Sequence, residues 1–105
     1  MRVIFMPGAR AQLRAIHDYI ARDDKFAARA VIARVEQIAA LIGENPGIGR
    51  KLPRGRLRRF PVRPYPYLIF YEIAGPVVRI IRVRHAVRRP TLHEPGQAYV
   101  DETVS

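Results

Sequence analysis

The chain of 105 residues contains no cysteine, and its one serine is the last residue, Ser105. The absence of cysteine excludes disulfide bonds and thiolate metal ligands, and it is in keeping with a cytoplasmic protein. Without a Cys or an internal Ser, the familiar acyl-transfer triads have no nucleophile. The histidines His17, His85 and His93 lack metal-ligand spacing, so we expect neither a metal nor another cofactor.

Long apolar runs and acidic residues are also scarce. No apolar stretch approaches the roughly 18 residues of a membrane span, and no signal-peptide core begins the chain, so we expect no contact with a membrane. The 19 Lys and Arg outnumber the 9 Asp and Glu, which gives a net charge of +10, and 17 of these basic residues are Arg. Because guanidinium binds carboxylates and phosphates bidentately, we expect an anionic partner, either nucleic acid or an acidic protein segment.

The apolar pattern predicts one domain of the α+β class in the order strand, helix, helix, strand, strand, strand. Apolar residues recur at helical spacing from Ala9 to Ala21, and again from Asp24, a favourable N-cap, to Gly43. We expect these helices to form a hairpin packed on one face of a small, mostly antiparallel sheet. The predicted strands are residues 2–6, 56–62, 65–73 and 77–85.

The strand over residues 65–73 is apolar on both sides, which favours a central position in the sheet. Its tyrosines are expected to pack in the core. Residues 1–90 are expected to form the single domain. Residues 91–105 turn polar and acidic and are expected to form a C-terminal tail.

The most basic stretch is residues 50–63, where seven of fourteen residues are Lys or Arg. Two prolines and a glycine interrupt it, which predicts an exposed loop. Such a concentration of like charge repels itself unless a partner neutralises it, so this loop is predicted to be a docking surface. On the strand over residues 77–85, simple alternation places Arg82 and Arg84 on one face and Arg79 on the other.

Four segments follow one another along residues 2–89: "ARAQLRAIHDYIARDD", "AARAVIARVEQIAALIGENPGIGRKL", "LRRFPVRPYPYLIFYEI" and "VVRIIRVRHAVRRP". They contain Ala-x-x-x-Leu-x-x-Ile-x-x-Tyr-Ile, a Pro-x-x-Gly-Arg loop, a Tyr-x-Tyr-Leu-Ile-Phe-Tyr strand after an Arg, and a closing His-Ala-x-Arg-Arg. In this ordered combination the chain resembles the RelE/ParE superfamily of bacterial toxins. The resemblance implies that fold, a role as the toxin of a type II toxin–antitoxin pair, and neutralisation by an antitoxin encoded beside it.

The superfamily has two activities on one fold: RelE-like members cleave mRNA on the ribosome, and ParE-like members inhibit DNA gyrase. Ribosome-dependent members resemble one another in a lysine-rich site, whereas Lys51 is the one Lys of this chain outside its predicted helices. We therefore interpret the chain as closest to the ParE branch, with gyrase as target, no catalytic residue, and an acidic, partly disordered antitoxin that folds on binding. The residues expected to bind target or antitoxin are Arg50, Lys51, Arg54, Arg56, Arg58, Arg59, Arg63, Arg82 and Arg84.

Two alternatives stay open. The first is a RelE-like mRNA endoribonuclease, in which Lys51 or Glu44 takes a proton, Arg58, Arg82 and Arg84 hold the phosphorane charge and His85 acts as the acid. The second is a basic nucleic-acid-binding module, whose binding depends strongly on salt. Outside the nuclease hypothesis, His85 has a structural role as a strand-ending residue that is hydrogen-bonded to the backbone or to a tyrosine.

Overall fold

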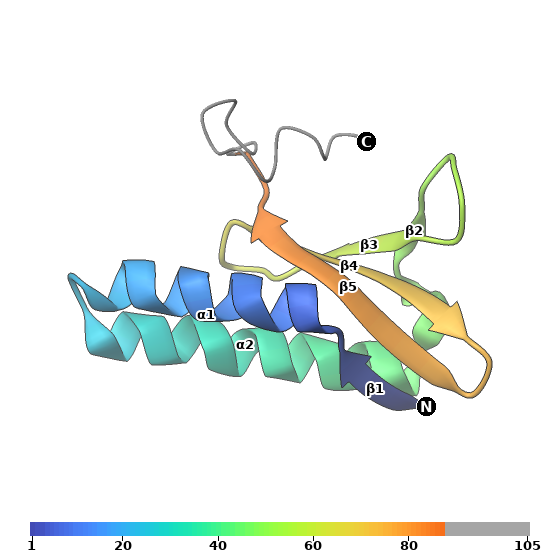
Figure 1. Ribbon diagram of the computed structural model, residues 1–105, viewed down its shortest axis with the longest axis horizontal. Coiled ribbons are helices and arrows are strands. Elements are labelled where there is room, and N and C mark those ends of the chain that lie inside the picture. Colours follow the sequence, from blue (N-terminus) through green and yellow to red (C-terminus); the bar gives the residue numbers. More distant parts are fainter. Residues whose placement is uncertain (88–105) are drawn as a thin grey trace.

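The computed structural model describes residues 1–87 of the chain. The predicted tail, residues 91–105, lies outside the described residues. These residues form five strands and two helices, and a 3-10 turn, η1, follows the second helix (Figure 1). Their bounds are β1 (Arg2–Phe5), α1 (Pro7–Ala21), α2 (Lys25–Glu44), η1 (Pro46–Ile48), β2 (Arg50–Lys51), β3 (Arg58–Pro61), β4 (Tyr67–Ala74) and β5 (Val77–His85).

The strands form one mixed sheet in the order β1-β5-β4-β3-β2. β1 runs parallel to β5, and every other pair of neighbours is antiparallel. Figure 1 shows α1 and α2 lying side by side as a hairpin along one face of this sheet. The predicted α+β fold is therefore confirmed, and β4 is the central strand, as its two apolar sides indicate.

Both helices begin at local start signals in the sequence. Pro7 occupies the first turn of α1, where its missing N–H is not needed, and Met6 precedes it without a side-chain cap. The Asp24 carboxylate accepts hydrogen bonds from the N–H groups of Phe26 and Ala27, at 2.9 and 3.0 Å, which confirms the predicted cap of α2. In the described part of the chain, neither helix combines the length and the apolar character that crossing a membrane requires.

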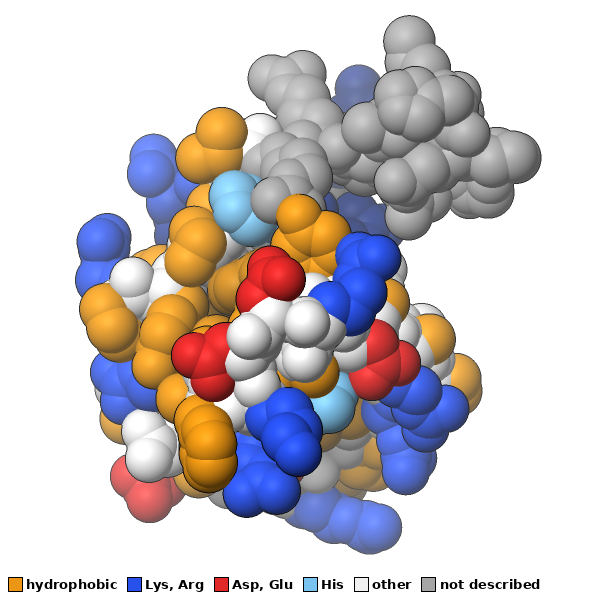
Figure 2. Space-filling view, turned by 90° about the vertical axis from the view of Figure 1, so that its left-hand side faces the viewer, with side chains coloured by type: hydrophobic (Ala, Val, Ile, Leu, Met, Phe, Trp, Pro, Cys, Tyr) orange, Lys and Arg blue, Asp and Glu red, His pale blue; other side chains and the backbone are white. Residues whose placement is uncertain are grey.

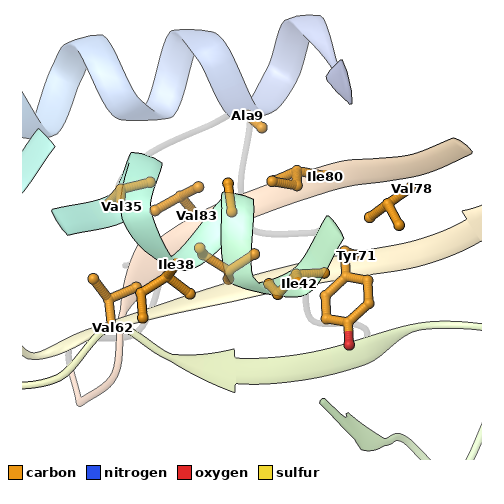
Figure 3. Close-up of a cluster of buried hydrophobic side chains, with 11 residues drawn as sticks. Ala9, Val35, Ile38, Ile42, Val62, Tyr71, Val78, Ile80 and Val83 are labelled. Carbon is orange, nitrogen blue, oxygen red and sulfur yellow. The ribbon is translucent and has the colours of Figure 1, made fainter. Parts of the chain in front are cut away.

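The core lies between α2 and the sheet (Figure 3). Val35, Ile38 and Ile42 of α2 pack with Tyr71 of β4 and Ile80 of β5, and each of these side chains is buried. Burying an aliphatic side chain of this size contributes about 1.5–3 kcal/mol, so the core determines which side of each strand points toward the helices. The remaining strand residues point to the other side of the sheet.

The prediction of one continuous loop over residues 50–63 is wrong. β2 and β3 lie within it and pair antiparallel, with Arg50 opposite Arg59 and Lys51 opposite Arg58. A strand of two residues is too short to produce an alternation pattern, and it forms here because β3 offers it a partner. The strand predicted over residues 56–62 is present as the shorter β3.

A β-bulge changes which arginines of β5 share a face. The register of β4 and β5 shifts between Phe70 and Tyr71, where β5 carries one extra residue. The alternation of β5 side chains between the two faces of the sheet is therefore shifted by one residue beyond the bulge. Arg79, Arg82 and Arg84 all lie on the same face, because they are paired with alternate residues of β4. The prediction that Arg79 lies on the opposite face is wrong.

Candidate functional site

One face of the sheet is covered by the helices, and the other carries a row of arginines. Arg50, Arg59, Phe70 and Arg82 are paired in register across β2, β3, β4 and β5, so their side chains share a face. Because the adjacent Tyr71 points into the core, this row points away from the helices. We call this side the open face. By register it comprises Arg50, Arg59, Pro61, Leu68, Phe70, Glu72, Ala74, Val77, Arg79, Arg82 and Arg84, and Arg2 and Ile4 of β1 continue it.

Phe70 is buried on the open face, although neither α1 nor α2 covers it. The guanidinium carbons of Arg82 and Arg84 lie over its ring, 5.8 and 5.1 Å from the ring centroid. The Arg84 guanidinium also donates to the backbone carbonyl of His85 at 3.1 Å. A cation over an aromatic face is attracted by the ring quadrupole, and a stacked guanidinium keeps its donors at its edge. Phe70 thus gathers two cations into one site.

The open face carries an excess of positive charge. Glu72 is the one acidic residue of the five strands, and Arg79 binds its Oε2 atom through Nε at 3.1 Å and Nη2 at 2.7 Å. Arg50, Arg59 and Arg82 form no ion pair within residues 1–87. This arrangement suits a partner that presents phosphate or carboxylate groups.

Arg58 and Lys51 lie on the opposite side of the sheet from this row. Arg58 is paired with Tyr71, and its Nη1 atom donates to the carbonyls of Gly49 at 2.9 Å and Gly47 at 3.4 Å. Arg58 therefore holds the turn between α2 and β2 in place. Lys51 shares the face of Arg58 by register and is exposed.

Tyr71 also stabilises the turn between α2 and β2, through hydrogen bonds made from the core side. Its hydroxyl donates to the carbonyl of Pro46 at 2.7 Å and accepts from the N–H of Gly49 at 2.8 Å. Burial raises the pKa of the Tyr71 hydroxyl above its usual value of 10.0, while the Gly49 hydrogen bond and the Arg58 charge oppose this rise. The hydroxyl stays neutral near pH 7, and the predicted core packing of this tyrosine is confirmed.

His85 ends β5 on the helix-facing side of the sheet, paired with Tyr67. The two rings meet edge to face with centroids 5.4 Å apart, and His85 Nδ1 accepts from the N–H of Val87 at 3.1 Å. These contacts are of the structural kind expected for a strand-ending histidine. Tyr67 and Tyr71 are four residues apart along β4, about 13 Å, so the position of His85 is far from that of Arg58.

The residues considered for RNA cleavage are not all brought together: Lys51 and Arg58 are paired across β2 and β3, but Arg82 and His85 lie apart from them. Arg82 lies on the open face, whereas Arg58 and Lys51 lie on the other side at the far end of the strands from His85. Glu44 is exposed at the last residue of α2. Within residues 1–87, no three His, Asp or Glu side chains gather in a way that could hold a metal ion.

The other predicted docking residues lie in connections. Arg54 and Arg56 are exposed in the turn between β2 and β3. Arg63 is exposed between β3 and β4, and its carbonyl accepts a hydrogen bond from Arg34 Nε of α2 at 2.7 Å. The nine predicted residues therefore divide among the open face, the opposite side of the sheet and two connections.

Sequence reasoning missed the role of Phe70. Its place in a continuous apolar strand indicates burial, but not burial beneath arginines. The role of Phe70 becomes evident from its pairing with Arg82, and this pairing depends on the bulge in β5. Nothing local in the sequence marks that bulge.

Comparison with known proteins agrees with this fold. The chromosomal ParDE toxin–antitoxin structure from P. aeruginosa has a TM-score of 0.71 at 20% identity, over 81% of this chain and 95% of that chain. The YoeB dimer from Staphylococcus aureus has a TM-score of 0.55 at 15% identity, over 81% of this chain and 95% of that one. At these identities the likeness shows the shared fold.

Sequence comparison establishes the family. The toxin RelE2 of Caulobacter vibrioides is 39% identical over 87 residues, which are 83% of this chain and 97% of that protein. Residues 3–90 match the family model described as the ParE toxin of the type II toxin–antitoxin system parDE. Membership implies a cognate antitoxin as partner. The chain belongs to the ParE toxin family, within the RelE/ParE superfamily of type II toxins.

Proposed function

We propose that this toxin binds DNA gyrase and inhibits it without chemical turnover, until its antitoxin neutralises it. The match to the ParE family model over residues 3–90 supports the gyrase branch of the superfamily. Residues 1–90 form the toxin domain in this proposal. The protein then acts in the cytoplasm, where gyrase and its DNA are found.

The observation that carries the proposal is the composition of the open face. Arg82 and Arg84 lie over Phe70, and Arg59 and Arg50 continue the row across the sheet. Arginine stays protonated and is a poor general base. Efficient proton transfer needs a His, carboxylate or Lys within hydrogen-bond reach of the reacting group. A surface rich in guanidinium and poor in such groups suits binding better than cleavage.

The open face also suits the chemistry of a gyrase–DNA complex. Such a complex presents phosphate oxygens and protein carboxylates, and guanidinium binds both through two parallel N–H donors. Each phosphate or carboxylate that meets this face displaces counterions or water. We therefore expect the inhibition to weaken as the salt concentration rises.

A second candidate is a ribosome-dependent mRNA endoribonuclease. The 39% identity to a protein named toxin RelE2 favours it. Its candidate catalytic residues are those considered from the sequence, Lys51, Arg58, Arg82 and His85. Because these residues are not all brought together in the free toxin, cleavage requires the ribosome or the mRNA to complete the site.

The test uses purified toxin, freed of antitoxin, with gyrase, plasmid and ATP. The expected result is loss of supercoiling or trapped linear DNA, reversed by antitoxin. Arg82→Ala/Arg84→Ala should require at least about tenfold more toxin for the same inhibition, because truncating charged contacts costs about 2 kcal/mol or more. Arg79→Ala is the matched control: it removes an open-face arginine that Glu72 already neutralises.

A translation reaction run in parallel separates the two candidates. If gyrase is unaffected at micromolar toxin while mRNA is cut on ribosomes, the gyrase proposal fails and the nuclease is established. His85→Ala then becomes the decisive variant, because it should abolish cleavage only if His85 is the acid. In the gyrase assay His85→Ala should leave inhibition within about twofold, since its contacts are structural.

A further inference from the structure

The charges of the chain are divided unevenly along its length. All 19 Lys and Arg lie within residues 1–90, together with six of the nine acidic residues. Residues 91–105 contain no Lys or Arg and carry the other three acidic residues, Glu94, Asp101 and Glu102. We call residues 91–105 the acidic segment. The match to the toxin family ends at residue 90, so the acidic segment lies outside the part of the chain that this match covers.

The open face presents guanidinium groups that no described side chain neutralises. Arg50, Arg59 and Arg82 lie in one row across the sheet and form no ion pair within residues 1–87. Glu72 on the same face is already bound by Arg79. Like charges that gather on one face repel one another, and an anionic group that approaches them relieves this repulsion. The open face therefore attracts carboxylates of this chain as well as those of a partner.

The acidic segment follows β5 closely enough to reach this face. β5 ends at His85, and the residue before it, Arg84, already lies on the open face. Neighbouring strands are about 4.8 Å apart, so the row from Arg82 to Arg50 spans about 15 Å, whereas fifteen residues can extend to about 50 Å. A segment joined to its site by a short connection has an effective concentration on the order of millimolar. Weak ion pairs are then sufficient to fill the site.

The residue pattern of the acidic segment also matches the open face. Leu68 of the central strand β4 is half-buried on this face. In the acidic segment, Tyr99 and Val100 directly precede Asp101 and Glu102. Such a stretch offers apolar side chains and carboxylates together, just as the open face offers an apolar strand and guanidinium groups together.

We propose that the acidic segment binds the open face of its own toxin and competes there with the target. Its three carboxylates pair with the arginines of the row. A target that presents a denser set of phosphate or carboxylate groups displaces the segment, which thus sets how much toxin is needed for inhibition. The competition rests on the proposed function, in which the open face meets the target, whereas the location of the segment does not.

The charge and the attachment of the acidic segment favour it over other occupants. A second copy of the chain is repelled by the net charge of +10 that both copies carry. A separate acidic protein or a nucleic acid has to compete with a segment that is held beside the face in every molecule. The segment therefore fills the open face whenever no stronger anionic partner is present.

The first test locates the acidic segment by a spin label. The chain contains no cysteine, so Thr103→Cys provides a single site for a nitroxide next to Glu102. In isotope-enriched toxin, the label should broaden the amide signals of β3, β4 and β5 more than those of α1 and α2. The broadening should disappear at high salt concentration, because salt screens exposed ion pairs. It should also disappear in Glu94→Gln/Asp101→Asn/Glu102→Gln, which we call the neutralised variant.

Several outcomes of this test overturn the proposal. Broadening that is absent, or that is as strong on the helices as on the sheet, shows that the segment does not bind the open face. Broadening that persists in the neutralised variant shows that the carboxylates do not hold it there. A mixture of spin-labelled toxin with isotope-enriched, unlabelled toxin provides the last check. Broadening in this mixture overturns the proposal in favour of contacts between two copies.

The second test measures the competition with the target. The neutralised variant should inhibit gyrase at about 3- to 10-fold lower toxin concentration, because exposed ion pairs contribute modestly. The matched control, Asp18→Asn/Asp23→Asn/Glu36→Gln, removes three carboxylates from exposed positions of the helices and the turn between them. Figure 2 views the end of the molecule that carries this turn, where acidic and basic side chains are mixed. The control should change the inhibitory concentration by less than about twofold.

The two tests distinguish failure of this proposal from failure of the proposed function. If no form of the toxin inhibits gyrase, the proposed function fails, and the spin label still decides where the segment lies. If gyrase is inhibited but the neutralised variant is no more potent than the wild type, the competition is overturned while the inhibition stands. Equal gains in potency for the neutralised variant and the control also overturn it, because net charge alone then explains the effect.

Discussion

Arg82 lies directly across the β4–β5 pair from Phe70, with its guanidinium carbon 5.8 Å from the centre of the phenyl ring. Arg84 lies over the same ring at 5.1 Å, so a single aromatic side chain organises two cations on the face that the helices leave uncovered. In the proposed function, this relationship makes a strand that is apolar on both sides part of the surface that binds the target. It also makes the ring itself a testable part of that surface.

Replacing the ring while keeping an apolar side chain should weaken the toxin. Phe70→Leu removes the aromatic face beneath two guanidinium groups, each held by about 0.5–1 kcal/mol, and should raise the half-inhibitory toxin concentration about 3- to 10-fold. Phe60→Leu is the matched control, since Phe60 packs against the core from the other face of β3. Inhibition assays on folded protein should show no such loss for Phe60→Leu, and equal losses in the two variants would argue against the role of Phe70.

Gly49 should tolerate no side chain. A Cβ atom there would lie 2.5 Å from the Tyr71 hydroxyl, and Tyr71 is fully buried and cannot move aside. Gly49→Ala should lower the free energy of unfolding by about 2–4 kcal/mol through overpacking and lost hydrogen bonds. A Cβ at Gly47 meets no atom within 4 Å, so Gly47→Ala should change the free energy of unfolding by less than about 0.5 kcal/mol. Urea unfolding of both variants measures the contrast, and similar stabilities would refute it.

Stability should fall at alkaline pH because of Tyr71. Its folded-state pKa is raised by burial above 10.0, so as the pH rises past about 10 the unfolded chain loses this proton first. The contribution of the Tyr71 hydroxyl to the free energy of unfolding is therefore fully present below pH 10, and it is lost as the pH rises through the folded-state pKa. Tyr71→Phe removes this part of the dependence of the free energy of unfolding on pH. It also lowers that free energy by about 1–3 kcal/mol, because Pro46 and Gly49 lose their hydrogen-bond partner. Denaturant titrations at pH 8 to 11 compare the two proteins, and parallel pH profiles would contradict the assignment.

Gln12 should matter through its side-chain oxygen. Its Oε1 atom accepts from the N–H of Val83 at 2.8 Å and so joins α1 to β5 beyond the end of the β1 ladder. Gln12→Ala leaves that N–H without its acceptor and should cost about 1–2 kcal/mol. Gln12→Glu keeps an acceptor oxygen in the same place. Thermal unfolding should rank wild type and Gln12→Glu above Gln12→Ala, and equal melting temperatures for all three would show that water replaces the amide.

The sequence by itself determined the two helices, the longer strands and the class of fold. Asp24 caps α2 because a short carboxylate reaches the first free N–H groups of a helix, a local interaction that needs no tertiary contact. The apolar stripe that includes Val35, Ile38 and Ile42 repeats at helical spacing, and β4 is apolar on both sides. Each of these signals is contained in a few neighbouring residues, so each can be read without the folded molecule.

Only the tertiary structure decided which charged side chains act together. The extra residue in β5 places Arg79 on the face of Arg82 and Arg84, against simple alternation, and β2 exists only because β3 pairs with it. Likewise, β1 becomes an edge strand because it docks parallel to β5, more than seventy residues away in sequence. These features arise from pairing between distant segments. Their physical cause is therefore the complete sheet and the core beneath it, and no local pattern of residues contains that information.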